Sequence, residues 1–261
     1  MIVVAGPCSI ESEETTLLIA EELRKISDNL GLEIIFKASF DKANRSSINS
    51  YRSVGLDGGA YLVKSIFNRV KSMGLRTTTD IHEPWQAKSV SEFIDIIQIP
   101  AFLCRQTDLL VAAAKTGKIV NVKKGQFLSP EEMSNIVNKL KASGCDSERI
   151  YVTERGTFFG YGRLVNDMTS IPIMQSFGCP VIFDATHSVQ KPGGLGTSTG
   201  GNREFVEPLA KAATAIGVDG LFFEVHPNPD KALSDGPNTL RLDGFEDVLE
   251  RVLQHSERRW S

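Results

Sequence analysis

Short runs of β-branched and aromatic residues recur along the whole chain, and longer stretches with apolar residues at helical spacing separate them. Eight such runs are expected to be β-strands: 2–5, 33–38, 76–80, 96–99, 120–123, 150–154, 181–184 and 221–225. The clearest helical stretches are 13–30, 109–115, 130–143, 205–216 and 245–255. Eight strand–helix units in a chain of 261 residues predict an α/β fold, a single-domain (β/α)8 TIM barrel over residues 1–261.

An open, doubly wound sheet is the competing fold. It usually has a glycine-rich dinucleotide loop after its first strand, whereas this chain has Gly6-Pro7-Cys8-Ser9 there. Helix boundaries support the barrel. Ser129 before Pro130 is typical of an N-cap. The glycines expected to end helices in the left-handed conformation are Gly31, Gly74, Gly117, Gly144, Gly178 and Gly217.

Charge and apolar content narrow the class of protein. Twenty-nine basic and 32 acidic residues give a net charge of -3 with no long run of one sign, which argues against nucleic-acid binding. We find no apolar run near the roughly 18 residues of a membrane span and no basic segment after Met1, so we expect neither membrane insertion nor secretion. The four scattered cysteines are expected to be reduced thiols, as in a cytoplasmic enzyme.

Polar side chains stand where each predicted strand ends, which is the catalytic face of a barrel. In chain order they are Cys8, Lys37, Asp80, Gln98, Lys123, Arg155, His187 and Glu224. The loop 191–202 is unusually rich in glycine, serine and threonine, and a loop of this length in a compact domain is more often functional than idle. These strand ends are therefore the predicted active site.

The cationic members of this set indicate an anionic ligand. Lys37, Lys42, Arg45, Lys123 and Arg155 would converge on one mouth, where phosphate or carboxylate would balance their charge. A lysine at a strand end could instead form a Schiff base with a carbonyl substrate, so an imine-forming aldolase stays open on these residues alone.

A thiol, an imidazole and two carboxylates form a second constellation: Cys8, His187, Glu224 and Asp235. Their strands are neighbours in a closed barrel, so the four side chains can meet. Mixed sulfur, nitrogen and oxygen ligands suit zinc, iron, manganese or cobalt without selecting one. The alternative is that Cys8 is a small buried hydrophobe and His187 a hydrogen-bonded residue of the rim.

Five segments carry a resemblance to a known family. They read AGPCSIES at 5–12, FKASFDKANRSS at 36–47, QIPAFLCRQTD at 98–108, NVKKGQ at 121–126, and DATHSVQ at 184–190 followed by PGG at 192–194. Over nearly its whole length the chain resembles the 3-deoxy-D-manno-octulosonate-8-phosphate synthases, also called 2-dehydro-3-deoxyphosphooctonate aldolases. The heptulosonate-phosphate synthases are a sister family with a related barrel, but the motif ATHSVQ favours the octulosonate enzymes.

The resemblance implies a condensation of phosphoenolpyruvate with D-arabinose 5-phosphate and water. The products are inorganic phosphate and 3-deoxy-D-manno-octulosonate 8-phosphate, a precursor of a lipopolysaccharide sugar. The enol carbon attacks the aldehyde, water adds at the phosphate-bearing carbon, and phosphate leaves with cleavage of its C–O bond. Two alternatives stay open: the sister synthase, which uses erythrose 4-phosphate, and a barrel that binds phosphosugars without catalysis.

The resemblance also implies roles for individual residues. Those expected to bind phosphoenolpyruvate are Lys37, Lys42, Gln98, Ala101, Lys123 and Arg155. Those expected to bind arabinose 5-phosphate are Asn44, Arg45 and Ser46, together with Arg105 reaching across a subunit interface, which implies a homotetramer. The residues expected to take part in catalysis are Cys8, Lys42, Asp80 and His187.

The family divides on metal use. One branch has cysteine at the position of Cys8 and requires a divalent ion, whereas the other has asparagine there and does not. Because this chain has the cysteine, the resemblance implies one divalent metal ion on Cys8, His187, Glu224 and Asp235, with zinc, iron, manganese and cobalt all open.

Overall fold

The computed structural model describes residues 1–45, 47–158, 162–192 and 200–256. Eight parallel strands close into a ring, because the last of them, β12, pairs with the first, β1. In ring order they are β1 (Ile2–Gly6), β2 (Glu33–Lys37), β3 (Arg76–Asp80), β4 (Ile96–Ile99), β5 (Ile119–Lys123), β6 (Ile150–Glu154), β9 (Val181–Asp184) and β12 (Gly220–His226). The predicted barrel is confirmed.

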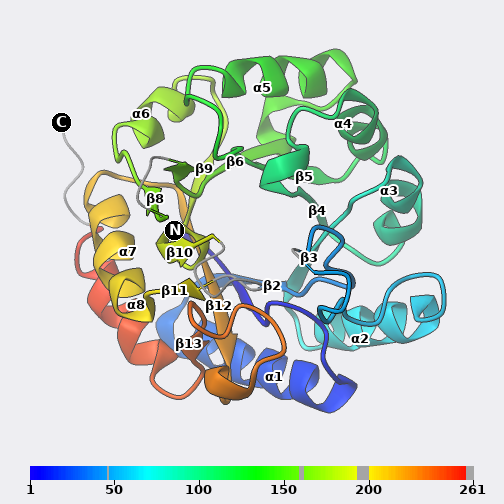
Figure 1. Cartoon of the computed structure of the whole chain (residues 1–261), viewed down its shortest axis with the longest axis vertical. Coiled ribbons are helices and arrows are strands. Elements are labelled where there is room, and N and C mark those ends of the chain that lie inside the picture. Colours follow the sequence, from blue (N-terminus) through cyan, green and yellow to red (C-terminus); the bar gives the residue numbers. More distant parts are fainter. Residues whose placement is uncertain (46, 159–161, 193–199, 257–261) are drawn as a thin grey trace.

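Among the described residues, eight α-helices surround this ring (Figure 1). They are α1 (Glu13–Leu30), α2 (Ala60–Ser72), α3 (Pro84–Ser91), α4 (Thr107–Ala114), α5 (Met133–Ala142), α6 (Ser170–Gln175), α7 (Val206–Ala215) and α8 (Phe245–Leu253). The loops contain short strands: β7 (Thr157–Phe158) pairs with β8 (Leu164–Val165), and β10 (Gln190–Lys191) pairs with β11 (Gly200–Gly201). A further short strand, β13 (Leu240–Arg241), pairs in parallel with the end of β12. The short 3-10 helices cover 101–103, 147–149, 187–189, 203–205 and 229–231.

Helix boundaries follow local hydrogen bonding. Ser12 caps α1 by accepting from the Thr15 amide at 3.1 Å. The six glycines predicted to end helices all have positive φ, between 62° and 90°. The predicted start of α5 is wrong. Residues 130–132 form a turn and the helix begins at Met133, so Glu132 and not Ser129 takes the N-cap position. The Ser129 amide donates to the Glu132 carboxylate at 2.9 Å.

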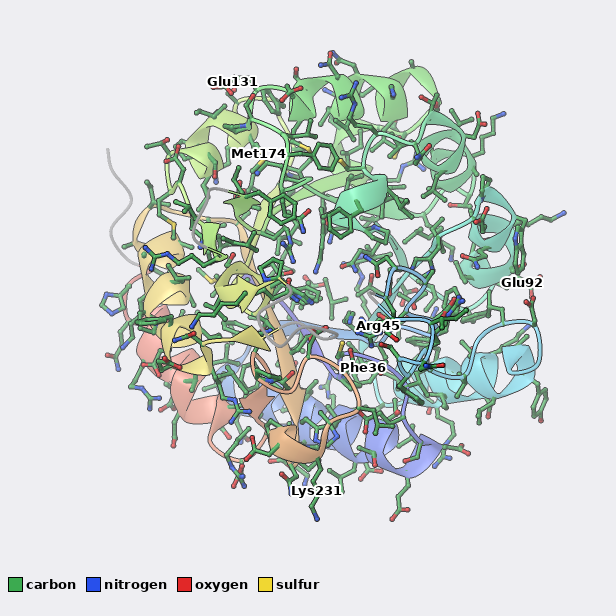
Figure 2. All side chains as sticks on the ribbon, viewed as in Figure 1. Phe36, Arg45, Glu92, Glu131, Met174 and Lys231 are labelled. Atoms are coloured by element: carbon green, nitrogen blue, oxygen red, sulfur yellow. The ribbon has the colours of Figure 1, made fainter. Side chains whose placement is uncertain are left out.

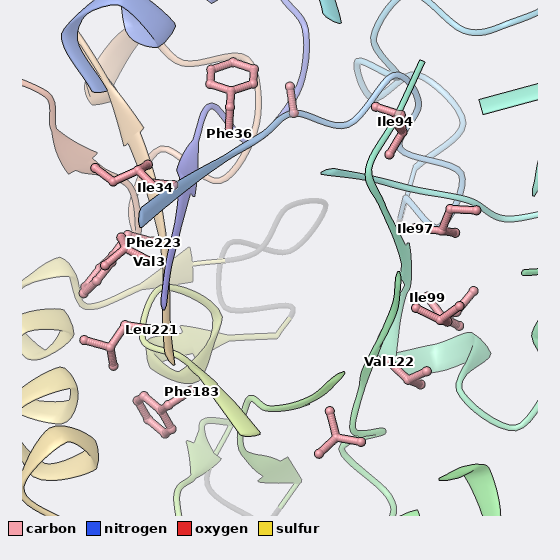
Figure 3. Close-up of a cluster of buried hydrophobic side chains, with 14 of the residues drawn as sticks. Val3, Ile34, Phe36, Ile94, Ile97, Ile99, Val122, Phe183, Leu221 and Phe223 are labelled. Atoms are coloured by element: carbon pink, nitrogen blue, oxygen red, sulfur yellow. The ribbon is translucent and has the colours of Figure 1, made fainter. Parts of the chain in front are cut away.

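Alternate residues of each strand pack on opposite faces of the barrel wall. The outward residues, among them Val3, Phe36, Ile97 and Phe223, are buried against the helices (Figure 3). A second, smaller cluster contains Val4, Ile35, Ile96, Tyr151, Ile182 and Phe222. This cluster lies inside the barrel, so the barrel interior is a packed core below the site. Within the described residues, we find no helix whose length and apolar character suit a transmembrane segment.

Candidate active site

Side chains alternate between the two faces of a β-strand, and this alternation explains how charged residues come to lie above the apolar interior. Ile35, Ile96, Ile182 and Phe222 point inward, and the residues two positions later point the same way. Those residues are Lys37, Gln98, Asp184 and Glu224, and all four are buried. They form a polar layer at the carboxyl ends of the strands, where barrel enzymes place their active sites.

A cavity of about 670 Å³ opens above this layer. The predicted site residues that line it are Lys37, Lys42, Asn44, Arg45, Asp80, Gln98, Ala101, Lys123, Arg155, His187 and Asp235. Arg45 comes from the loop after β2 and lies inside the ring of helices (Figure 2). Cys8 and Glu224 are buried beneath the lining and contact it. The structure therefore gathers most of the predicted site.

One predicted residue, Arg105, stands apart from this cavity, and another is not described. Ser46 lies outside the described residues, as does the 193–199 part of the loop expected to be functional. Arg105 is exposed and lines a separate, smaller hollow with Glu132 and Lys139. Arg105 therefore does not join the other predicted site residues at the cavity.

The two strand-end lysines are held by buried carboxylates. The Lys37 ammonium donates to the Cys8 carbonyl at 2.7 Å and to the Glu224 carboxylate at 2.9 Å. Lys123 donates to Asp184 at 2.5 Å, and its Nζ lies 3.8 Å from the centroid of the Phe222 ring. Burial lowers the pKa of Lys123, and the positive charge of Lys37 lowers it further. The negative charge of Asp184 raises this pKa but does not outweigh burial.

Arg155 lines the cavity and has one donor group without a partner. Its Nη2 donates to Gln190 Oε1 at 2.6 Å, but its buried Nη1 has no hydrogen-bond partner among the described residues. A buried donor of this kind calls for an acceptor. Counting the cavity lining, five cationic side chains face three carboxylates. Lys37 and Lys123 also pair with Glu224 and Asp184 beneath the lining, so the surplus lies in the lining alone. Its cationic donors still suit a phosphate or carboxylate ligand.

Lys42 and Asp80 differ from ordinary surface charges. Burial works to lower the pKa of Lys42, but the negative charges of Cys8, Asp80 and Glu224 outweigh it and raise that pKa. Burial opposes ionisation of Asp80, yet its hydrogen bond with His82 at 3.1 Å and the charge of Lys42 hold its pKa well below the usual value. Both groups therefore stay charged at neutral pH.

Three of the four predicted metal ligands come together. Donor atoms of Cys8, Glu224 and Asp235 all lie within 4.8 Å of one another, and Cys8 Sγ is 3.2 Å from Asp235 Oδ2. His187 lies beside this group, with Nε2 at 3.5 Å from Glu224 Oε1. Its Nδ1 is paired with Asp184 at 2.8 Å, which leaves Nε2 facing the group.

Two features of this cluster bear on metal binding. Burial and the neighbouring Glu224 raise the pKa of the Cys8 thiol. Glu224 Oε2 is buried and has no hydrogen-bond partner among the described residues. A thiol, an imidazole nitrogen and two carboxylates with such unmet demands fit a divalent ion of the zinc or iron type.

Several residues of the site carried no role in the sequence prediction. Asp184 and Gln190 belong to the segment DATHSVQ, but their contacts with Lys123 and Arg155 cannot be read from it. Ser234 precedes Asp235 and contacts Cys8, 226 positions away, at 2.8 Å. Strand-end position was the available signal, and it could have identified Asp184 at the end of β9. It could not identify Ser234, which lies on a loop, or Gln190, which lies on the short β10.

Comparisons with known proteins agree with this geometry. The model of the DAHP synthetase I family matches residues 1–259. The chain is 56% identical over 253 residues to the 2-dehydro-3-deoxyphosphooctonate aldolase of a Synechococcus species, an alignment that covers 97% of this chain and 87% of that protein. It is 55% identical to the aldolases of the same name from Desulfotalea psychrophila and Trichlorobacter lovleyi, with 97% of this chain covered in both and 89% and 91% of the relatives. The chain therefore belongs to the DAHP synthetase I family and, within it, to the group of the 2-dehydro-3-deoxyphosphooctonate aldolases.

Proposed function

We propose that this protein condenses phosphoenolpyruvate with D-arabinose 5-phosphate and water to form 3-deoxy-D-manno-octulosonate 8-phosphate and inorganic phosphate. The observation that carries the proposal is one cavity lined by Lys37, Lys42, Arg45, Lys123 and Arg155. Two phosphates and a carboxylate must be held close together in this reaction, and such a cation-lined cavity offsets their mutual repulsion. The names of the relatives do not favour the heptulosonate synthase or a non-catalytic barrel.

Phosphoenolpyruvate binds over the strand ends in this proposal. Lys37, Lys123 and Arg155 contact its phosphate and carboxylate, with Gln98 and Ala101 fixing its position. The unpartnered Nη1 of Arg155 supports this assignment because an anionic oxygen would satisfy it. Since Lys37 and Lys123 are already engaged by Glu224 and Asp184, the proposal needs no imine on either lysine.

Arabinose 5-phosphate binds beside it, with Asn44, Arg45 and Ser46 around its phosphate. The enol carbon of phosphoenolpyruvate then forms a bond to the aldehyde carbon, and negative charge develops on the aldehyde oxygen. Lys42, which its neighbours keep protonated, donates a hydrogen bond to that oxygen, while the Asp80 carboxylate orients Lys42. Water adds at the phosphate-bearing carbon, and the intermediate loses inorganic phosphate by C–O cleavage.

We assign a divalent metal ion, one of zinc, iron, manganese or cobalt, to Cys8, His187, Glu224 and Asp235. When bound, such an ion supplies Lewis acidity toward the aldehyde oxygen and orients a nearby water. The proximity of three of these ligands and the orphaned Glu224 oxygen support the assignment. Strong chelation should abolish turnover and added zinc, iron, manganese or cobalt should restore it. Full activity in a protein shown by elemental analysis to be metal-free would refute the assignment.

We also propose a homotetramer in which Arg105 serves the sugar phosphate of a neighbouring subunit. Its exposed position outside the cavity of its own subunit supports this, as do the half-exposed and stacked rings of Phe102 and Phe158 nearby. Arg105→Ala should raise KM for arabinose 5-phosphate more than KM for phosphoenolpyruvate. Mixing this variant with a second inactive variant should restore some activity in hybrid oligomers, and sedimentation velocity should give the mass of four chains.

The four cysteines are free and buried, which is in keeping with a reducing compartment. We therefore place the reaction in the cytoplasm, where it would supply lipopolysaccharide synthesis.

One assay tests the proposed reaction directly. The protein is incubated with phosphoenolpyruvate and either arabinose 5-phosphate or erythrose 4-phosphate, and phosphate release and product mass are followed. We expect an eight-carbon product with the five-carbon sugar and little turnover with the four-carbon one. Preference for erythrose 4-phosphate would support the sister activity, and binding without turnover of either sugar would support a non-catalytic barrel.

A further inference from the structure

Two neutral side chains lie between the proposed substrate arginines and the proposed metal ligands. Ser234 Oγ accepts from Arg45 Nη2 at 2.5 Å and lies 2.8 Å from Cys8 Sγ. Gln190 Oε1 accepts from Arg155 Nη2 at 2.6 Å, and Gln190 Nε2 donates to Asp235 Oδ1 at 3.3 Å. Each arginine is thus joined to the ligand cluster through a single residue.

Donor and acceptor chemistry fixes the direction of both links. A guanidinium can only donate, so the Ser234 oxygen must accept from Arg45. The Ser234 hydroxyl proton then points to Cys8 or to Asp235 Oδ2, which is 3.3 Å away. In the same way, the Gln190 amide must turn its oxygen to Arg155 and its nitrogen to the Asp235 carboxylate. Both links run from a cation, through a neutral group, to a ligand that is anionic when it binds a metal.

Because Ser234 and Cys8 are buried, they cannot easily exchange their hydrogen bonds for bonds to water. Ser234 is only 4% exposed, and Cys8 is also 4% exposed, so little water can replace their contact. Asp235 has φ of 51°, a conformation that non-glycine residues rarely adopt, so the loop that holds both Ser234 and Asp235 has a defined shape. A change in the position of Cys8 or Asp235 must therefore shift Ser234 or Gln190, and with it one arginine.

We propose that Ser234 and Gln190 are positioning residues that couple metal binding to substrate binding, each for one substrate. This inference rests on the proposed function. A cation that fixes Cys8 and Asp235 also fixes Ser234 and Gln190, which hold Arg45 and Arg155 ready for an anion. Because coupling between two sites is reciprocal, each bound substrate also raises the affinity for the metal. Ser234 serves arabinose 5-phosphate and Gln190 serves phosphoenolpyruvate.

The test measures binding of each substrate alone, since neither turns over without the other. Isothermal titration calorimetry gives Kd for arabinose 5-phosphate and for phosphoenolpyruvate with metal-free and with zinc-loaded protein. The ratio of the two Kd values is the coupling for that substrate. In the wild type we expect ratios of about tenfold, within the usual range for coupled sites. Ser234→Ala should lower the ratio for arabinose 5-phosphate to about twofold and leave that for phosphoenolpyruvate unchanged.

Gln190→Met is the matched control, because it has a similar length and lacks both hydrogen bonds. It should lower the ratio for phosphoenolpyruvate and leave that for arabinose 5-phosphate unchanged. Unchanged ratios in both variants would mean that direct contact between metal and substrate carries the coupling, and would overturn the proposal. So would an equal fall of both ratios in either variant, which indicates a general loosening of the site.

The wild type separates this inference from the proposed function. If it turns over both substrates but binds each with the same Kd with and without zinc, the coupling is refuted and the reaction stands. If it does not turn over the two substrates, the proposed function itself fails. Thermal unfolding of both variants confirms that they are folded at the temperature of the titration.

Discussion

Two layers inside the barrel differ in chemistry although they lie on the same strands. The lower layer is apolar and includes Ile35, Ile182 and Phe222. The layer two residues later along the strands is charged, although its members are equally buried. This upper layer includes Lys37, Asp184 and Glu224. The buried Asp80, Lys123 and Arg155 continue it at the carboxyl ends of β3, β5 and β6. A rise of only about 6.6 Å, two residues of a strand, separates a packed core from a charged site.

The difference shows that the cost of burying charged side chains is concentrated in the upper layer. Buried charges are tolerated only when they are paired, and the upper layer pairs Lys37 with Glu224 and Lys123 with Asp184. Even so, Arg155 Nη1, Asp80 Oδ1 and Glu224 Oε2 have no partner among the described residues. The lower layer completes its own packing, whereas the upper layer is arranged for ligands that satisfy its remaining donors and acceptors.

Substitutions at Lys37 and Ile35, on the same strand, compare the two layers directly. Lys37→Met leaves the buried Glu224 unpaired and should cost about 3–5 kcal/mol of unfolding free energy. It should also lower turnover at least about a hundredfold, since a charge that faces the reaction is lost. Ile35→Ala should cost about 2–5 kcal/mol through a cavity but keep turnover per folded molecule within about threefold. Denaturant unfolding and assays of the folded protein measure both, and an equal loss of turnover would contradict the division into layers.

Substitutions at Cys8 test whether activity depends on the proposed divalent metal ion. Cys8→Ala supplies neither a ligand nor a hydrogen bond and should lower turnover at least about a hundredfold. Cys8→Asn also loses the thiolate, so affinity for zinc and iron should fall sharply. Its amide can still hydrogen-bond to a water or a substrate hydroxyl, so we expect measurable activity that chelators do not abolish. The two variants are assayed side by side with and without chelator, and equal inactivity would refute this role for the side chain.

A third pair of charges supports the upper layer from outside the cavity. Lys124 is fully buried, 3.5 Å from Glu154, and donates to Thr157 Oγ1 at 3.1 Å. Glu154 accepts from the amides of Arg155 and Gly156 at 2.9 and 2.6 Å, which fixes the backbone that carries Arg155.

Lys124→Met and Glu154→Gln should each cost about 3 kcal/mol of stability, because each leaves one group of a buried pair uncompensated. The double variant should cost clearly less than the sum, since it removes both charges. KM for phosphoenolpyruvate should rise in all three variants while KM for arabinose 5-phosphate stays close to the wild type. Additive losses would show that the two charges do not interact.

The strands were predictable because strands buried on both faces read as short apolar runs. All eight predicted ranges agree with the structure to within two residues at either end, from β1 to β12. Helices were less certain where local sequence signals are weak. The eight-residue α3 and the six-residue α6 are too short to show a clear apolar period, and neither was among the clearest stretches. The start of α5 was misplaced because residues 130–132, which follow Ser129, form a turn before the helix begins at Met133.

The site was predictable to the extent that it sits on strands. Position at a strand end identifies Lys37 or Glu224, because the barrel fixes where strand ends meet. It does not identify Ser234, whose contact with Cys8 depends on the conformation of a loop that includes the left-handed Asp235. It also does not place Arg105, which lines a separate hollow and not this cavity.

Phe222 is the point where the two layers touch. Lys123 Nζ lies 3.8 Å and Lys37 Nζ 5.7 Å from its ring centroid, so an aromatic face supports both ammonium groups. Phe222→Leu should weaken this support by about 1 kcal/mol and raise KM for phosphoenolpyruvate about fivefold. Phe223→Leu is the matched control, because the next ring points outward and packs on Phe245 at 5.4 Å. It should lower stability by a similar amount without changing KM, and equal effects on KM would exclude a role for the ring.

Ion pairs on the outer helices are partly exposed and can be compared with the buried ion pairs of the upper layer. Glu207 of α7 accepts from Arg251 of α8 at 2.8 and 2.9 Å, and it also pairs with Lys211 at 2.8 Å. These contacts, above all the hydrogen bond from Arg251, lower the pKa of Glu207 to about 2. The Glu207 side chain is 25% exposed and that of Arg251 46%, so solvent screens the pair.

Glu207→Gln should therefore cost only about 0.5–1 kcal/mol at neutral pH and leave turnover unchanged. Because the folded pKa lies below the ordinary value of 4.5, the stabilisation is complete above pH 4.5 and is lost as the pH falls toward 2. The difference in unfolding free energy between wild type and variant should shrink over that interval, and also in 1 M salt. Urea unfolding at a series of pH values measures it. A difference that grows as the pH falls would show that Glu207 is stabilised in its protonated form, contrary to the pairing with Arg251.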